Sequence, residues 1–555
     1  MPVINLNIAD LHSLLGKDIP VDELVQRVPM IGADAGKPDE GILPVEFFPD
    51  RPDMFSVEGA ARALRFFLAS DEELESMELP EYPVKSSGLT MTVDASVGQV
   101  RPFVVGAVVR NVEMTDQLIQ SLMDHQEKLH ITIGRKRVKA AIGVHDLDPI
   151  NGPFRYTTAP GDLSFIPLMK EREMTLTQIL QRHEKGVAYA HILDEMENYP
   201  IILDRDQQVL SFPPIINGTL TTVTEGTTDI FIDVTGMELR PITLALNILC
   251  AAFAERGATI ESIDISYAED HPQFPGGNLT VPDLKPKDRT VRVAELNELL
   301  TTTLSAGEWI LPFKRMGLRA EPTDTQTSLK VQYPAYRADI LHDWDIFEDA
   351  AIGYGYQNIP SVPPSVQTTG KPLNIVSGIR KFQRTLSGMG YSEVKTLTLT
   401  GERDGYDSMG LPLPGDDIMV HNPITEDHTR LRTSLLPSLL GILRANRHRD
   451  LPQRIMEPGI IVREKGNQWM AAGVAIHSKA GFTEIKSTIE TILPAFGKEW
   501  TIKSGEHPSF VNGRYAEIHV DGRIGYFGEL HPSVITSFSL EYPVIGFEMM
   551  LSPLL

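Results

Sequence analysis

The sequence has little cysteine and lacks the short motifs that mark several common enzyme chemistries. Its 555 residues include one cysteine, Cys250, which excludes an internal disulfide and a zinc site built from several thiolates. No HExxH, CxxC or GxSxG motif occurs. Cys250 falls on the apolar side of an expected helix, 241–256, so we expect a buried, unreactive thiol. The scarcity of cysteine fits a reducing compartment, and we expect a cytoplasmic protein.

Long apolar runs and an excess of basic charge are also missing. The strongest apolar stretch, 242–254, is interrupted by Asn247 and is too short to span a bilayer, and the first residues lack the basic region of a secretory signal. We therefore expect no membrane segment. Lys and Arg number 51 against 74 Asp and Glu, a formal net charge of −23. A polyanion is repelled by such a chain on average, so nucleic acid must bind at a local basic patch or through a partner.

The length predicts three or four domains, and three segments read as linkers. Residues 70–83 combine six carboxylates with two prolines, 269–278 contain two prolines and paired glycines, and 359–372 are again rich in proline. We expect these segments to form neither a core nor a regular element. The predicted units are a mixed α/β N-terminal module, a β-rich domain, a small α+β domain and a C-terminal module, covering 1–90, 91–270, 277–358 and 365–555. The fold class is therefore an α+β multidomain protein rather than one doubly wound sheet.

An acidic segment ends the third predicted unit. Asp339 is expected at the start of a helix, with Asp345, Glu348 and Asp349 following it, and residues three and four apart share a helix face. Magnesium prefers such oxygen ligands and would relieve their repulsion at a contact between subunits. The alternative is an acidic first turn placed for the helix dipole, with Arg337 as counter-charge. From spacing alone the alternative is favoured.

Polar residues interrupt the apolar strands of the second unit between 203 and 236. They are Ser211, Asn217, Thr224, Glu225, Asp233 and Thr235. A carboxylate there would bind the amine of a small zwitterion, and Asn or Thr would bind its phenol or carbonyl. Turn chemistry at Asn217–Gly218 and Glu225–Gly226 explains the same residues more simply and is favoured without further information.

A basic segment lies upstream of these strands. Arg135, Lys136, Arg137 and Lys139 are close together in an otherwise acidic chain. Such a patch suits phosphate contacts, although a solvated loop is the commoner explanation. His145 and Asp148 follow at a strand end, where they belong either to the same pocket as the polar strand residues or to a turn.

Seven segments in one order resemble the beta-subunit family of phenylalanyl-tRNA synthetases, of the shorter archaeal and eukaryotic cytosolic type, over essentially the whole chain. They are FPDRPDMFSVEGAARAL (48–64), EKLHITIGRKRVKAAIGVHDLDPI (127–150), VLSFPPIING (209–218), DIFIDVTG (229–236), YRADILHDWDIFEDAAIGYGY (336–356), NPITEDHTRLRTSLLPSLL (422–440) and GELHPSV (528–534). The resemblance implies an editing domain at 91–270, a metal-associated domain at 277–358 and a class II synthetase-like antiparallel-sheet module at 365–555.

The resemblance also assigns residues and partners. It implies Mg²⁺ at Asp339, Asp345, Glu348 and Asp349, shared with an alpha subunit, and reverses the preference stated above. It places the editing pocket near Ser211, Asn217, Glu225, Asp233 and Thr235. The implied assembly is an alpha2beta2 heterotetramer that binds tRNA(Phe), attaches L-phenylalanine to it with ATP, releasing AMP and diphosphate, and hydrolyses mischarged Tyr-tRNA(Phe).

The last module lacks the cations of a working class II site. Such a site needs one arginine on a central strand for the ATP phosphate and another in a glycine-rich segment for the γ-phosphate. Arg454 and Arg463 flank the strand RIMEPGIIV, but GYFGELHPS has no arginine. We therefore expect catalytic inactivity in this module and adenylate formation on the alpha subunit. The alternatives are an assembly or tRNA-positioning subunit with a vestigial editing pocket and a deacylase that acts without alpha.

Overall fold

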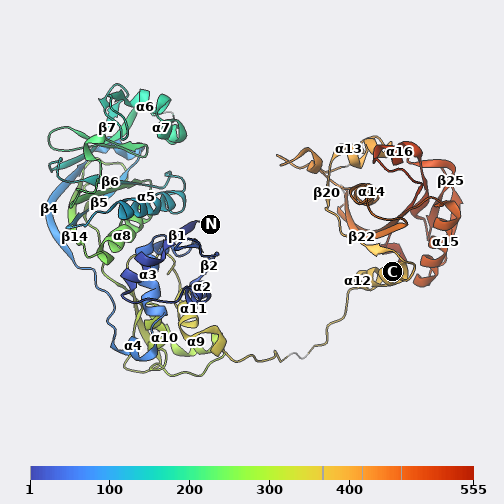
Figure 1. The fold of residues 1–555 in the computed structure, drawn as a ribbon, viewed down its shortest axis with the longest axis horizontal. Coiled ribbons are helices and arrows are strands. Elements are labelled where there is room, and N and C mark those ends of the chain that lie inside the picture. The colour runs from blue at the N-terminus through green and yellow to red at the C-terminus, as the bar shows by residue number, and fades with distance from the viewer. Residues whose placement is uncertain (1, 195, 366–367, 416, 464–465) are drawn as a thin grey trace. The chain divides into compact units, whose positions relative to one another are not determined.

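The computed structural model describes residues 2–194, 196–365, 368–415, 417–463 and 466–555, which divide into two compact units, Met1–Pro363 and Pro364–Leu555 (Figure 1). Both units combine helices with sheets, in agreement with the expected mixed α/β multidomain class. No helix of the described residues is long and apolar enough to cross a membrane.

The first unit begins with a small antiparallel sheet of order β1-β3-β2, with helices packed beside it. The strands are β1 (Val3–Asn7), β2 (Ala33–Ala35) and β3 (Ile42–Phe47), and the helices are α1 (Ile8–Leu15), α2 (Val21–Arg27), α3 (Val57–Phe67) and α4 (Asp71–Ser76). Ser56 caps α3 through the backbone N–H of Gly59, as its position suggests. The prediction that 70–83 forms no regular element is wrong, because Ser70 and Glu73 form a capping box that starts α4.

A ten-stranded sheet occupies the middle of the first unit. Its order is β12-β11-β10-β7-β4-β14-β5-β13-β6, with β15 paired to β14. The strands are β4 (Val84–Val93), β5 (Phe103–Arg110), β6 (Ala140–Asp146), β7 (Phe154–Pro160), β10 (Asn198–Leu203), β11 (Val209–Phe212), β12 (Ile216–Asn217), β13 (Ile230–Gly236), β14 (Thr259–Tyr267) and β15 (Asn278–Val281). The proposed boundary between residues 90 and 91 falls inside β4, which pairs with β7 and β14 of this sheet.

Helices and a small subdomain cover this sheet. α8 (Leu239–Glu255) packs on β5 and β13, and α5 (Asp116–Ile131) precedes β6 (Figure 1). Cys250 on α8 is fully buried, and burial raises the pKa of its thiol, so the expectation of an unreactive cysteine is supported. The subdomain has its own core around Phe212 and Ile179. Its elements are β8 (Ser164–Phe165), β9 (Met174–Thr175), α6 (Leu176–Arg182) and α7 (Glu184–Tyr189).

The last part of the first unit is a three-stranded antiparallel sheet with helices. Its elements are β16 (Lys287–Arg292), α9 (Val293–Leu300), α10 (Ile310–Arg315), β17 (Arg319–Pro322), β18 (Ser328–Tyr333) and α11 (Asp343–Tyr354). Trp309, Phe313 and Phe347 fill its core. α10 contacts α3 and α4, so this part packs against the N-terminal helices (Figure 1).

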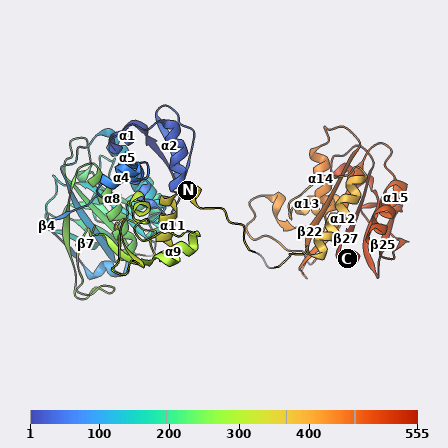
Figure 2. The same ribbon diagram turned by 90° about the horizontal axis from the view of Figure 1, so that it is seen from below.

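The main sheet of the second unit has seven described strands and a separate apolar core on each face, and the unit also contains a two-stranded sheet of β20 (Leu399–Thr400) and β21 (Arg430–Leu431). The order is β19-β22-β23-β27-β26-β25-β24, antiparallel except for β19 beside β22. The strands are β19 (Ser392–Glu393), β22 (Gln453–Arg463), β23 (Gly466–Ile476), β24 (Thr501–Ser504), β25 (Phe510–His519), β26 (Arg523–Leu530) and β27 (Val544–Met550). α12 (Asn374–Gly388) and α15 (Phe482–Ile492) share one core, and α14 (Leu436–Ala445) and α16 (Pro532–Ser537) share the other. Figure 2 shows α12, α14 and α15 together with the strands of this unit.

Candidate functional site

A buried carboxylate and a buried imidazole lie in contact on β13 and β6, the last two strands in the order of the large sheet. His145 Nε2 lies 2.7 Å from Asp233 Oδ1, and His145 Nδ1 lies 2.8 Å from Thr221 Oγ1. Thr221 ends a short 3₁₀ helix, Thr219–Thr221. Asp233 and Thr221 are at most 2% exposed and His145 is fully buried. Burying a carboxylate or an imidazole costs free energy unless the group is hydrogen-bonded. The hydrogen bonds of Asp233, His145 and Thr221 therefore fix the positions of these side chains.

The sheet register explains how these side chains meet. β13 pairs with β6 so that Asp233 lies opposite Gly143 and Phe231 opposite His145. Residues two apart on a strand share a face, so Asp233 and His145 are diagonal neighbours on one face. Gly143 leaves room for the carboxylate, because a Cβ atom there would lie 2.3 Å from Asp233 Oδ1. His145 thus lies on β6 in contact with Asp233 rather than in a turn, whereas Asp148 is exposed in a turn.

The other polar residues named from the sequence divide into two groups. Ser211 is buried on β11 opposite Asn217 of β12, and the Asn217 side chain donates to the Val144 carbonyl at 3.2 Å. Asn217 and Thr221 thus both attach their loop to β6. Glu225 instead lies in an exposed turn, and no hydrogen bond within the described residues joins it to this group. We call Ser211, Asn217, Thr221, Asp233, Thr235 and His145 the polar cluster of the large sheet.

Arg101, which the sequence interpretation missed, holds Thr235 in place. Its guanidinium donates to Thr235 Oγ1 at 2.9 Å and to the Thr235 carbonyl at 2.7 Å. Arg101 is 1% exposed, and burial lowers its pKa to about 10. Its second set of bonds goes to the carbonyls of Arg137 (3.0 Å) and Val138 (3.1 Å). The available signal for Arg101 in the sequence was the position of a charged residue just before the apolar strand β5.

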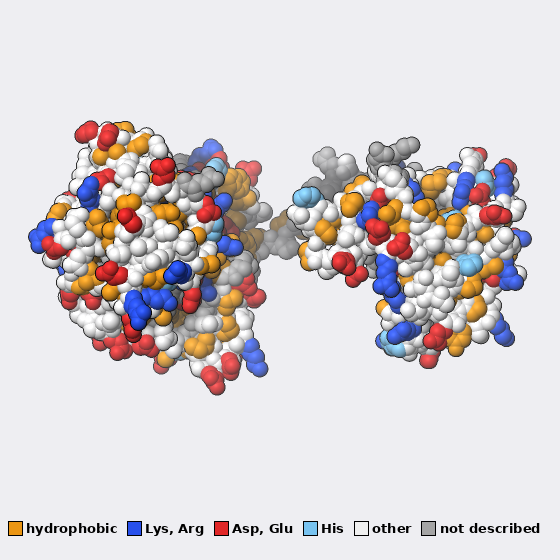
Figure 3. Space-filling view, turned by 90° about the horizontal axis from the view of Figure 1, so that it is seen from above, with side chains coloured by type: hydrophobic (Ala, Val, Ile, Leu, Met, Phe, Trp, Pro, Cys, Tyr) orange, Lys and Arg blue, Asp and Glu red, His pale blue; other side chains and the backbone are white. Residues whose placement is uncertain are grey.

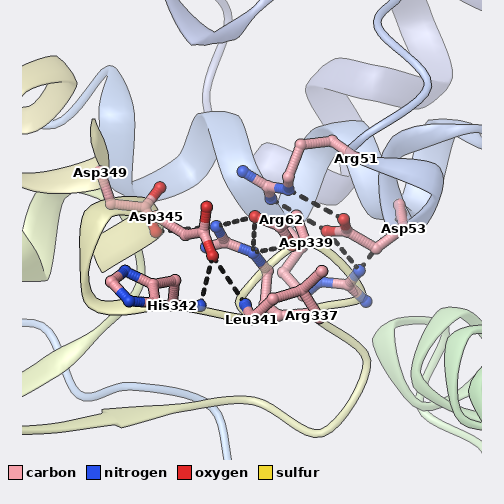
Figure 4. A network of polar contacts seen from close by, with 9 residues as sticks. All are labelled: Arg51, Asp53, Arg62, Arg337, Asp339, Leu341, His342, Asp345 and Asp349. Carbon is pink, nitrogen blue, oxygen red and sulfur yellow. Dashed lines mark hydrogen bonds and ion pairs between the residues drawn. The ribbon is translucent and has the colours of Figure 1, made fainter. Parts of the chain in front are cut away.

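The acidic residues of the third part lie around Arg337 (Figure 4). Arg337 donates to both Asp339 oxygens and to Asp349 Oδ2, the latter at 2.7 Å. Asp345 accepts from the backbone N–H groups of Leu341 and His342 at 2.7 and 2.6 Å. The expectation that Asp339 starts the helix is wrong, because His342 caps α11, which begins at Asp343. Glu348 is exposed on α11.

Buried arginines of the N-terminal part adjoin this group. Arg51 Nε donates to Asp53 Oδ1 at 2.9 Å, and Arg62 lies 3.5 Å from the same carboxylate (Figure 4). Burial raises the pKa of Asp53, but Arg51, Arg62 and Arg337 outweigh burial and lower that pKa to about 2. Arg62 also lies over the Tyr336 ring, 3.8 Å from its centroid. The segment FPDRPDM therefore supplies structural charges that the sequence interpretation left without a role.

Electrostatics at Glu348 favour a cation. Glu348 is only partly shielded from water, and this partial burial and the neighbouring Asp50, Asp349, Asp345 and Asp339 all raise its pKa. Burial likewise outweighs Arg337 and raises the pKa of Asp349. Within the described part of the chain, no three His, Cys, Asp or Glu side chains stand ready around one metal position. The donor chemistry suits Mg²⁺, but its binding requires these carboxylates to rotate from their present hydrogen bonds.

Two acidic side chains, Glu457 and Glu548, are buried beside the sheet of the second unit. Glu457 is fully buried against Arg432 at 2.9 Å, and Glu548 accepts from Ser434, Leu435 and Tyr526. Arg454, one of the two arginines considered for phosphate binding, forms an ion pair with Glu484 at 3.1 Å. This set of charges is unfavourable for a triphosphate.

Comparison with known proteins places this arrangement in a family. Residues 102–263 match the model of the B3/4 domain, 289–356 that of the tRNA synthetase B5 domain, and 359–551 that of the phenylalanyl tRNA synthetase beta chain CLM domain. The solved N-terminal fragment of the phenylalanyl-tRNA synthetase beta subunit from Pyrococcus horikoshii is 34% identical, with a TM-score of 0.60, and the match covers 64% of this chain and 100% of the fragment.

Relatives match over the full length as well. The phenylalanine–tRNA ligase beta subunit of Methanosarcina acetivorans is 44% identical over 557 residues, covering 100% of this chain and 99% of the relative. The corresponding protein of Archaeoglobus fulgidus is 44% identical over 559 residues, covering 100% and 98%. The resemblance seen in the sequence is thereby confirmed, and the chain belongs to the family of phenylalanine–tRNA ligase beta subunits.

Proposed function

We propose that the chain works as the beta subunit of an alpha2beta2 phenylalanine–tRNA ligase. The complex attaches L-phenylalanine to tRNA(Phe), consuming ATP and releasing AMP and diphosphate. The beta chain hydrolyses mischarged Tyr-tRNA(Phe) at the polar cluster of the large sheet, which we call the editing cluster from here on. Membership of the family supports the first role, and the buried Asp233–His145–Thr221 chain inside the segment that matches the B3/4 domain is the observation on which the second role depends.

Editing is needed because tyrosine differs from phenylalanine by one hydroxyl. A hydrophobic synthetic pocket rejects an added hydroxyl poorly, by about a hundredfold in a comparable case, whereas a site that hydrogen-bonds this group distinguishes the two amino acids well. Ser211 and Asn217 supply neutral polar groups for the phenol, and Asp233 supplies a carboxylate for the α-amine. Asp233 Oδ1 is held by His145, while Oδ2 forms no hydrogen bond with another described side chain.

Hydrolysis at this site uses water. The water oxygen attacks the ester carbonyl carbon, the bond between that carbon and the ribose oxygen breaks, and the proton passes to the ribose oxygen. No Ser or Cys nucleophile with a neighbouring base lies in the cluster, so the contribution of the protein is to orient the ester and the water. The fixed Asp233–His145 pair provides that orientation.

Adenylate formation belongs to the alpha subunit in this proposal. Among the described residues of the second unit, Glu457 and Glu548 place buried acidic groups beside the sheet and Arg454 is paired with Glu484, which makes the unit unfavourable for binding a triphosphate. Mg²⁺ would be held by Asp339, Asp345, Glu348 and Asp349 together with the alpha subunit, where it neutralises mutually repelling carboxylates. The exposed Leu341 and Trp344 beside these residues supply apolar surface for the same contact.

Reconstitution tests the proposal. The chain is to be co-expressed with a class II alpha subunit, and aminoacylation with phenylalanine and hydrolysis of Tyr-tRNA(Phe) are measured for each chain alone and for both together. We expect aminoacylation from the complex and from neither chain alone, and hydrolysis from the complex. A complex that attaches phenylalanine but leaves Tyr-tRNA(Phe) intact would mean that the editing cluster is vestigial. Full hydrolysis by a monomeric beta chain would contradict the subunit model.

A further inference from the structure

The loop between α5 and β6 has an unusual backbone. Arg135, Lys136 and Arg137 are three consecutive residues in the left-handed region, with φ of 45°, 54° and 69°. Residues other than glycine rarely adopt this conformation, and a run of three persists only where the surroundings hold it in place. The run also brings several basic residues together at the surface of a chain with net charge −23.

Buried contacts hold this loop against the editing cluster. Arg101 bonds the carbonyls of Arg137 and Val138 and at the same time bonds Thr235 on β13. The Arg137 guanidinium donates to the carbonyls of Pro214 (3.2 Å) and Ile215 (2.9 Å), in the segment that joins Ser211 to Asn217. One loop is thereby connected to both sides of the editing cluster.

The side chain of Arg137 is occupied by these contacts, whereas the side chains of Arg135 and Lys136 are not. Its guanidinium also lies over the Tyr189 ring and 3.5 Å from Glu127. Lys139 forms an ion pair with Glu238 at 2.9 Å. Arg135 and Lys136 are exposed, and neither has an ion pair with any residue that the structure describes. Figure 3 shows that both basic and acidic side chains lie on the displayed face of the first unit.

We propose that Arg135 and Lys136 form a phosphate-binding subsite for the 3′-terminal single strand of the aminoacylated tRNA, next to the editing cluster. This inference rests on the proposed editing function. An ester at the end of a nucleic acid reaches the cluster only with its last phosphates close by, and an acidic chain repels those phosphates unless fixed cations compensate locally. The left-handed run presents two cations without an ion-pair partner among the described residues, and the contacts of Arg101 and of the Arg137 side chain hold the C-terminal end of the run.

The test uses the complete alpha2beta2 complex and Tyr-tRNA(Phe) at several salt concentrations. The double variant Arg135→Gln/Lys136→Gln removes both charges and leaves an unbranched polar side chain at each position. Arg135→Lys/Lys136→Arg keeps both charges. Lys285→Gln/Lys287→Gln is the matched control, because these lysines are also exposed in the first unit and their loss changes the net charge equally.

Each phosphate contact to a single strand contributes a slope of about 0.7 to the dependence of log affinity on log salt. We therefore expect the Gln double variant to reduce that slope for kcat/KM by about 1.4 and to raise KM on the order of tenfold near ~0.1 M salt, with kcat within about twofold of wild type. The charge-keeping variant and the lysine control should behave as wild type.

The outcomes separate this inference from the function on which it rests. If the wild-type complex hydrolyses Tyr-tRNA(Phe) and the Gln variant keeps the wild-type salt slope, the phosphate subsite is refuted while editing stands. A fall in kcat at unchanged slope would mean that the loop only supports the cluster, and this also refutes the subsite. A wild-type complex without hydrolysis overturns the editing function and the subsite together.

Discussion

Replacing Gly143 by alanine tests the geometry of the editing cluster most sharply. The new Cβ atom would lie 2.3 Å from Asp233 Oδ1 and 2.7 Å from His145 Nε2. A carbon and an oxygen in contact keep a distance of about 3.3 Å. The carboxylate must therefore withdraw by about 1 Å, which separates it from the imidazole or rotates both side chains.

A displacement of that size has a large effect on a positioned reaction. A misplacement of ~1 Å lowers the rate of an enzyme by about a hundredfold. We expect Gly143→Ala to reduce the hydrolysis of Tyr-tRNA(Phe) by about that factor, while attachment of phenylalanine stays within about twofold because it takes place elsewhere. The change is local, since one methyl group is added within a large sheet.

The assay is single-turnover hydrolysis of Tyr-tRNA(Phe) by the complex. Gly307→Ala is the matched control, because its Cβ atom would meet nothing closer than a Ser305 oxygen at 4.0 Å and its backbone is not left-handed. This variant should hydrolyse at the wild-type rate. Wild-type hydrolysis by Gly143→Ala, in a complex that still attaches phenylalanine, would refute the assignment of Asp233 to the editing reaction.

Three further predictions concern single side chains. His145→Asn should lower hydrolysis roughly 10- to 100-fold at unchanged KM, because a hydrogen bond to a charged group contributes about 1.5–3 kcal/mol, and a rise in KM alone would contradict this role. Arg337→Met leaves the buried Asp349 unpaired and should destabilise the chain by roughly 3–5 kcal/mol in urea unfolding, whereas Arg289→Met, which removes a partly exposed pair with Asp343, should cost about 1 kcal/mol or less. The pKa of Asp53 is lowered from 3.8 to about 2, so its stabilisation of roughly 2 kcal/mol is present above pH ~4 and lost between pH ~4 and ~2. Unfolding of Asp53→Asn should therefore respond less to that acid range than wild type, and an equal response would exclude this linkage.

Local patterns predicted several elements because their causes are local. Ser56 at an N-cap position indicates the start of α3, and the β-branched and aromatic residues of 230–236 indicate a strand, on which Asp233 and Thr235 share a face. The same logic explains the error at 70–83. The acidic residues and prolines of 70–83 predict a linker, whereas Ser70 and Glu73, at the spacing of a capping box, indicate the start of a helix.

Long-range contacts were not predictable in this way. The contact between Asp233 and His145 depends on the register between β13 and β6, and these two residues are 88 positions apart in the sequence. The sequence alone therefore leaves two interpretations of His145, a residue of the pocket or a residue of a turn. Arg101 and the arginines of residues 51–62 are buried because carbonyls and carboxylates from distant segments satisfy them, and no local pattern records this. Glu225 is an example of the opposite error. It is close in sequence to the polar residues of the cluster, but it lies in an exposed turn away from them.

The most direct test of the account is the fate of Tyr-tRNA(Phe) in a complex whose beta chain has the substitutions Asp233→Asn and Asn217→Ala. The account predicts that hydrolysis of the mischarged tRNA falls by about a hundredfold or more, while attachment of phenylalanine is unchanged. Hydrolysis at the wild-type rate by this variant would contradict the central claim that the buried polar cluster of the large sheet is the editing site.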